Sequence, residues 1–171
     1  EEEITLRATC YHSGGGIYKI EGTFTLVPFL NQCHISVDGT DAELLSDGIF
    51  GSPYDKAAEK DISFISVSDA SVIEYIWDEQ SSVSGFGIWA KPGAIKNCII
   101  KYKENNADEY TVLESDKYSV MLPDASEGED AAYCPVFFDE KLSAQSLTLQ
   151  LELNEGIDEA ELSEAVCILE S

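Results

Sequence analysis

An acidic loop early in the chain carries oxygen-bearing side chains at close spacing. Asp47 and Ser52 lie within residues 44–54, between stretches that alternate in the manner of β-strands. A single carboxylate, Glu164, lies in the apolar stretch 162–169 that closes the chain. If the loop and the closing stretch meet in space, they enclose a small site lined by oxygen atoms. Such a site requires a framework that brings the two distant segments together.

Catalytic chemistry is poorly supported by the other side chains. His12 and His34 are the two histidines, and neither lies in a Ser/His/Asp context or a His-x-x-x-His context. Some of the 33 acidic residues must lie near one another, so a pair of glycosidase carboxylates stays open. Nothing marks such a pair out, and a sandwich of 171 residues is small for a glycosidase. We therefore expect a protein that is not an enzyme.

The charge balance argues against anionic partners. The chain has 33 Asp and Glu residues against 10 Lys and Arg residues, and its formal net charge is -23. This field repels nucleic-acid phosphates and anionic lipid surfaces. The hydrophobic fraction of 44% is typical of a globular domain. The sequence contains no run of 18 apolar residues, the length that would predict a membrane-spanning helix. The chain begins without Met, which suggests a piece of a longer protein.

The cysteines do not form a metal or redox motif. They are five in number, Cys10, Cys33, Cys98, Cys134 and Cys167, with no Cys-x-x-Cys spacing. Cys98 and Cys167 lie in alternating apolar runs, which predicts buried and inert thiols. A disulfide between Cys10 and Cys33 stays open if the compartment is oxidising.

Short strand-like stretches separated by turns account for most of the chain. Their spacing of roughly 8 to 12 residues, with almost no helical periodicity, predicts an all-β antiparallel sandwich or barrel. The length favours one domain, residues 1–171. The expected strands cover residues 4–11, 17–29 (two short strands), 62–67, 72–77, 83–90, 97–103, 110–113, 118–122, 135–138, 147–153 and 162–169.

Four phrases, taken in order, resemble a known family. The first is Leu45-Ser46-Asp47-Gly48 with Ser52 and Tyr54, and the second joins residues 73–77 to residues 83–88 through a turn. The third is the pair of stretches 100–102 and 110–113, and the fourth joins residues 147–151 to Leu162-Ser163-Glu164-Ala165-Val166. Together they resemble the discoidin-like (coagulation factor 5/8 type C) domains of the galactose-binding-like superfamily. This superfamily includes many bacterial carbohydrate-binding modules.

The resemblance implies a fold and a structural metal. It implies a jelly-roll-like antiparallel β-sandwich of about eight core strands over residues 36–171, with residues 1–35 as an N-terminal strand extension. It also implies a structural Ca²⁺ held by Asp47, Ser52 and Glu164 together with nearby backbone carbonyls. Ile49 stands where the family often has Asp or Asn, which predicts a weaker or empty site. Alternatively, Asp47 only caps a turn and Glu164 points to solvent.

Aromatic side chains are the candidates for ligand binding, because sugar rings stack on Trp and Tyr while polar groups hold the hydroxyls. Alternation places Tyr75, Trp77 and Tyr102 in the core. In the family the loops at one end of the sandwich hold the ligand. The candidates are therefore Tyr54, Trp89, Lys91 and Tyr133.

These observations predict a non-catalytic carbohydrate-binding module of a secreted or cell-surface multidomain bacterial protein. Its partners would be a glycan or glycoconjugate and neighbouring domains of a larger chain. The alternative is a protein-protein adhesion module or structural spacer on the same fold, without a sugar site. The alternative predicts an apolar or complementary surface patch instead of an aromatic platform.

Overall fold

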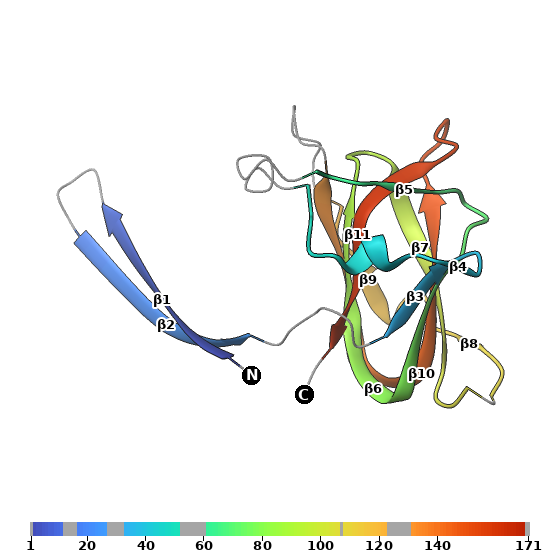
Figure 1. The fold of residues 1–171 in the computed structure, drawn as a ribbon, viewed down its shortest axis with the longest axis horizontal. Coiled ribbons are helices and arrows are strands. Elements are labelled where there is room, and N and C mark those ends of the chain that lie inside the picture. Colours follow the sequence, from blue (N-terminus) through green and yellow to red (C-terminus); the bar gives the residue numbers. More distant parts are fainter. Residues whose placement is uncertain are drawn as a thin grey trace.

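A computed structural model describes residues 2–11, 17–26, 33–51, 61–106, 108–122 and 131–169, and side chains are described from residue 33 onward. The described chain is almost entirely antiparallel β-sheet (Figure 1). Among these residues no helix has the length and apolar character needed to cross a membrane. The elements are β1 (Glu2–Tyr11), β2 (Ile17–Leu26), β3 (His34–Val37), β4 (Thr40–Asp41), the 3-10 turn η1 (Glu43–Ser46), β5 (Ile65–Val67), β6 (Ile73–Ala90), β7 (Ile95–Lys103), β8 (Thr111–Val112), β9 (Tyr118–Val120), β10 (Ala132–Leu153) and β11 (Ala160–Leu169).

Two long strands, β6 and β10, run through both layers of the sandwich and curve between them (Figure 1). The first layer has the order β4-β3-β6-β10-β7-β8 and uses the beginning of β6 and the end of β10. The second layer has the order β5-β11-β6-β10-β9 and uses the end of β6 and the beginning of β10. The antiparallel β-sandwich expected from the sequence is confirmed.

The core lies between the two layers. Tyr75 from the first layer packs against Phe86 from the second, with ring centroids 5.2 Å apart. The Tyr75 hydroxyl donates a hydrogen bond of 3.0 Å to the carbonyl of Ala165, which satisfies a buried polar group across the core. Trp77 is buried and Tyr102 packs against the core, so the inward alternation predicted for these aromatics is confirmed.

The sequence divides strands that the structure joins. Residues 78–82 and 139–146 contain polar residues typical of turns, and the predicted strands stop at them. Instead, β6 and β10 continue through both stretches, with Ser82 paired to Ser143 in the bend. The polar side chains of residues 78–80 and 139–141 are tolerated because they are exposed where the strands bend from one layer to the other. Register shifts lie between Phe137 and Leu142 and after Ala144, where the chain turns from one layer to the other.

The N-terminal strand pair forms a sheet of its own. β1 and β2 pair antiparallel in an unbroken register from Glu2 with Leu26 to Tyr11 with Ile17. Gly22 and Pro28 divide residues 17–29 into the two short strands that the sequence predicts, but the break at Gly22 is wrong, because this residue pairs with Leu6 inside a continuous β2. The proposed division at residue 35 within one domain stays a prediction.

Four cysteines of the described region, Cys33, Cys98, Cys134 and Cys167, are free thiols. Cys98 and Cys167 are buried as expected, and burial raises the pKa of the Cys98 thiol to about 12. These core thiols are therefore protonated and unreactive at neutral pH. The side chain of Cys10 lies outside the described residues.

Candidate functional site

The loop after η1 lies against the last strand and closes over Glu164. This side chain is completely buried, although it is a carboxyl group. Its Oε1 accepts hydrogen bonds from the backbone amides of Gly48, at 2.5 Å, and Ile49, at 3.0 Å. Gly48 has a φ of 79°, a left-handed conformation that glycine adopts without steric cost and that brings both amides to face the carboxyl group. These hydrogen bonds join the loop after η1, early in the described sandwich, to its last strand, β11.

Asp47 and Glu164 both accept a hydrogen bond from the backbone amide of Ile49. The Oδ1 of Asp47 accepts a hydrogen bond of 2.8 Å from Ile49, so Asp47 caps the turn. Burial, followed by the neighbouring Asp47 carboxyl group, raises the pKa of Glu164 to about 8, while the amides of Gly48 and Ile49 oppose the shift. The alternative in which Glu164 points to solvent is wrong. We call Asp47, Gly48, Ile49 and Glu164 the carboxylate clasp.

A calcium ion fits the oxygen chemistry of the carboxylate clasp. The buried Oε2 of Glu164 has no hydrogen-bond partner, and the Asp47 carboxyl group lies beside Glu164. The described residues hold no cluster of three or more His, Cys, Asp or Glu side chains arranged for a metal, so the remaining donors would be backbone and hydroxyl oxygens. The carbonyl of Phe50 already accepts a hydrogen bond of 2.8 Å from Ser163. Ser52, the third predicted ligand, lies outside the described residues.

Beside the carboxylate clasp, three rings pack on the outer face of the second layer. Trp89 and Tyr133 are register partners on β6 and β10, and their rings stack with centroids 4.4 Å apart and planes 30° apart. Phe50, from the clasp loop, lies with its centroid 4.5 Å from that of Trp89. Tyr133 remains 41% exposed, so one edge of the cluster faces solvent. We call Phe50, Trp89 and Tyr133 the aromatic platform.

A glycine allows the aromatic platform to lie close to the sheet. A Cβ atom on Gly87 would lie 2.9 Å from the Trp89 ring and 3.4 Å from the Tyr133 ring. The distance to the Trp89 ring is tighter than van der Waals contact allows, so any larger residue at position 87 would displace the indole, whereas the distance to the Tyr133 ring is an ordinary contact. The position of Trp89 therefore depends on the absence of a side chain two residues earlier in the same strand.

The structure brings two of the four predicted ligand-binding residues together. Trp89 and Tyr133 stack, whereas Lys91 is an exposed residue with other partners, the Glu161 carboxylate and the Phe64 ring, whose centroid lies 5.1 Å from its Nζ. Tyr54 lies outside the described residues. Their assignment as ligand-binding residues stays a prediction.

Sequence reasoning missed Phe50 and Gly87. An aromatic side chain between Ile49 and Gly51 in the acidic loop was an available signal for Phe50. Gly87 carries no such signal, because its role depends on a ring that folds back along its own strand.

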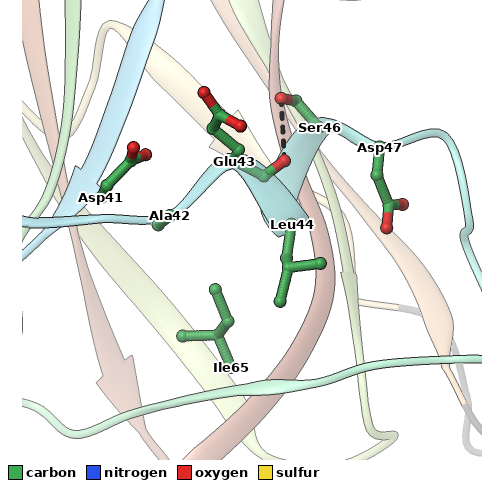
Figure 2. Close-up of a pocket in the computed structure, with 7 residues that line it drawn as sticks. All are labelled: Asp41, Ala42, Glu43, Leu44, Ser46, Asp47 and Ile65. Atoms are coloured by element: carbon green, nitrogen blue, oxygen red, sulfur yellow. Dashed lines mark hydrogen bonds between the residues drawn. The ribbon is translucent and has the colours of Figure 1, made fainter.

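An acidic hollow lies around η1, and Asp47 of the carboxylate clasp is one of its lining residues (Figure 2). Its volume is ≈ 490 Å³, and Figure 2 shows the apolar side chains of Leu44 and Ile65 facing one another in it. Its carboxylates are solvent-exposed, which weakens their hold on any ligand, and we assign it no role. The lining residues are Asp41, Ala42, Glu43, Leu44, Ser46, Asp47 and Ile65.

Comparison with known proteins defines the fold. No protein-family model matches the chain, and no curated protein matches its sequence. Solved structures do match. CpGH89CBM32-6 produced by Clostridium perfringens aligns with a TM-score of 0.53 and 10% identity over 82% of this chain and 95% of its own. A structure from the Streptococcus pneumoniae β-galactosidase BgaA aligns with a TM-score of 0.57 and 7% identity over 82% of this chain and 94% of its own.

A third similar structure is a two-domain protein of unknown function from Bacteroides fragilis. It aligns with a TM-score of 0.54 and 15% identity over 81% of this chain. The alignment covers 42% of that protein, so the chain corresponds to less than half of its length. These likenesses show that the chain shares its β-sandwich fold with the three structures. At these identities they show the fold alone.

Proposed function

We propose that this chain is a non-catalytic carbohydrate-binding module that holds a glycan on the aromatic platform. The observation that carries the proposal is the stacked pair Trp89 and Tyr133, which is partly exposed on the outer face of the second layer. The fold is shared with CpGH89CBM32-6, whose name denotes a carbohydrate-binding module of family 32. The discoidin-like resemblance of the sequence supports the same class.

The aromatic platform suits a sugar because its rings are already fixed. Trp89 is held between Phe50 and Tyr133, so little side-chain freedom remains to be lost on binding. The exposed edge of Tyr133 offers an apolar ring and a hydroxyl to one sugar. A net charge of -23 disfavours sulfated, sialylated and uronic-acid glycans. The ligand of this proposal is therefore a neutral glycan.

Calcium has a structural part in this proposal. Asp47, Glu164 and Ser52 would hold the ion, which supplies positive charge to two adjacent carboxylates. Because Phe50 follows the carboxylate clasp directly, a fixed clasp also fixes one ring of the aromatic platform. The clasp residues position the ligand site, and they do not contact the glycan.

The parent protein of this proposal is a secreted or cell-surface multidomain bacterial protein. A single aromatic platform gives modest affinity, and several modules on one chain raise it by avidity. Neither a nucleic acid nor membrane insertion has a place in this function.

One observation favours a second function, protein-protein adhesion or spacing on the same fold. Three exposed apolar side chains lie in this region: Met121 and Leu122, just after β9, and Phe137 on β10. Exposed apolar residues that lie together mark protein interfaces as well as ligand sites.

A glycan array followed by titration calorimetry tests the first function. We expect neutral galactose- or glucose-type glycans to bind, and Tyr133→Ala to weaken binding by about tenfold because a stacking contact is lost. Val112→Ala, on the exposed face of β8, is the control and should bind as the parent does. An array without a binder, together with flat titrations against galactose- and glucose-type sugars, would favour the adhesion function.

A further inference from the structure

Two exposed aromatic side chains lie along one line on β10, Tyr133 of the aromatic platform and Phe137, with the buried Pro135 between them. Tyr133, Pro135 and Phe137 alternate on the outer face in an unbroken register with Trp89, Gly87 and Gly85 of β6. Phe137 is 42% exposed, as much as Tyr133, whereas the next residue, Phe138, turns inward and packs on Phe86. Four strand residues span about 13 Å. Two exposed rings therefore lie on one face at that separation.

The strand beside this line, β6, carries two buried glycines opposite it. Gly85 and Gly87 are the β6 partners of Phe137 and Pro135, and neither projects a side chain from the sheet. A Cβ atom on Gly85 would lie 2.0 Å from the carbonyl oxygen of Val136, so only glycine fits this close approach of β6 to β10. On the β6 side no side chain projects at Gly85, and the Trp89 and Tyr133 rings lie over Gly87.

The edge strand β9 borders the other side of the line. The Met121 amide donates a hydrogen bond of 2.9 Å to the carbonyl of Pro135, and Ser119 is the register partner of Phe137. Met121 is 56% exposed and Ser119 is also exposed. A polarizable thioether and a hydroxyl therefore lie between and beside the two rings, where they can contact a ring face and a sugar hydroxyl.

We propose that the outer face of the second layer, from Tyr133 to Phe137, is an extended track that binds several consecutive sugars of one neutral oligosaccharide. The inference rests on the proposed carbohydrate function and specifies its ligand class. A single pyranose ring is too short to contact both Tyr133 and Phe137, so the second ring contributes only when the glycan is a chain. We call Tyr133, Met121, Ser119 and Phe137 the β10 track.

The net charge of the chain favours a neutral oligosaccharide over a second copy of the chain as the ligand of this face. Two copies facing each other would bring two formal charges of -23 together, which opposes self-association. A neutral oligosaccharide meets no such repulsion. Its ring faces and hydroxyls match a surface that alternates apolar rings with a thioether and a hydroxyl.

Titration with neutral galactose and glucose oligosaccharides of one to six sugars tests the β10 track. In the parent chain we expect affinity to rise with chain length and then to level off. Phe137→Ala should weaken binding of the longest oligosaccharides by about three- to tenfold, the usual effect of losing one stacking contact, and leave the shortest unchanged. Tyr133→Ala should weaken binding of all lengths. Val112→Ala, which changes an exposed apolar residue of the first layer, should alter neither the affinity nor its dependence on chain length.

Each of the other possible results would overturn a specific part of the proposal. Binding that depends on Tyr133 but not on chain length or Phe137 overturns the β10 track and leaves the proposed function intact. Absence of binding to every oligosaccharide and to the glycan array overturns both. Sedimentation that shows a dimer dissociated by Phe137→Ala would assign this face to a second copy instead. Thermal melting of Phe137→Ala within one or two degrees of the parent would show that an altered fold does not explain the result.

Discussion

The outer faces of the two layers each carry a tyrosine, and the two tyrosines differ in the contacts that their hydroxyl groups and rings make within the fold. On the first layer, the Tyr110 hydroxyl lies 2.5 Å from Glu74 and 2.6 Å from Ser146, and the Lys103 ammonium lies 4.1 Å above its ring. On the second layer, Tyr133 is stacked on one side by Trp89 and remains exposed. Both the hydroxyl and the ring of Tyr110 are engaged in holding the sheet.

The comparison shows which aromatic residue is available to a ligand. Tyr110 covers Ser146, a buried hydroxyl group, and burial followed by the hydrogen bond to Glu74 raises the pKa of Tyr110 to about 12. Within the described part of the chain, the Tyr133 ring stacks on Trp89 and its hydroxyl makes no hydrogen bond. A half-exposed aromatic residue is therefore a ligand candidate only when its polar atom and ring face are not engaged within the fold.

The largest expected effect concerns the buried carboxyl group of Glu164, which is compared with that of Glu74 on the first layer. In the absence of metal, the folded-state pKa of Glu164, about 8, lies above its ordinary value of 4.5. Its contribution to stability is fully present below pH 4.5 and is lost as pH rises toward 8, because the unfolded chain releases the proton first. Each unit between the two values corresponds to about 1.4 kcal/mol, so the loss is on the order of a few kcal/mol.

Denaturant unfolding between pH 4.5 and pH 9 with a chelator measures this loss. Glu164→Gln should flatten the profile, and added Ca²⁺ should stabilise the parent near pH 8 but not this variant, since a ligand of the folded state raises stability. Glu74→Gln is the matched control on the first layer and should keep both the pH profile and the calcium response. A profile that rises with pH in chelator would show that Glu164 is ionised without metal.

Removal of the Tyr110 hydroxyl should have an intermediate effect on stability and none on binding. Tyr110→Phe leaves Ser146, which is buried, without this hydrogen-bond partner. We expect a loss of about 1–2 kcal/mol in the free energy of unfolding, measured by urea denaturation. Glycan affinity should stay within twofold of the parent. A loss of affinity as large as that from Tyr133→Ala would remove the distinction between the two faces.

The smallest expected effect comes from one methyl group at Gly87. Gly87→Ala places a Cβ atom 2.9 Å from the Trp89 ring, so the indole must shift. We expect a change in near-ultraviolet circular dichroism and a loss of glycan affinity of about threefold, part of one stacking contact. Unchanged affinity after a demonstrated shift of Trp89 would mean that Tyr133 binds the glycan without it.

The strand content of the molecule was predictable from local pattern. Leu147, Leu149, Leu151 and Leu153 alternate with polar residues, and all four are buried in the core. The continuity of β6 and β10 was not predictable, because polar residues in a bend between layers have the same composition as a turn. The two cases differ only in whether Ser82 and Ser143 pair across the bend, which is a long-range contact.

The candidate site, like the fold, combines features that the sequence predicts with features that depend on tertiary structure. The sequence by itself determined which side chains are able to stack on a sugar or offer oxygen to a cation, since these properties belong to Trp89, Tyr133, Asp47 and Glu164 individually. Tertiary structure decided that Trp89 and Tyr133 stack, that Phe50 joins them, and that Glu164 is buried under amides 115 and 116 positions away in the chain. The physical reason is that alternation along a strand is local, whereas register between strands is set by the packing of the whole sandwich.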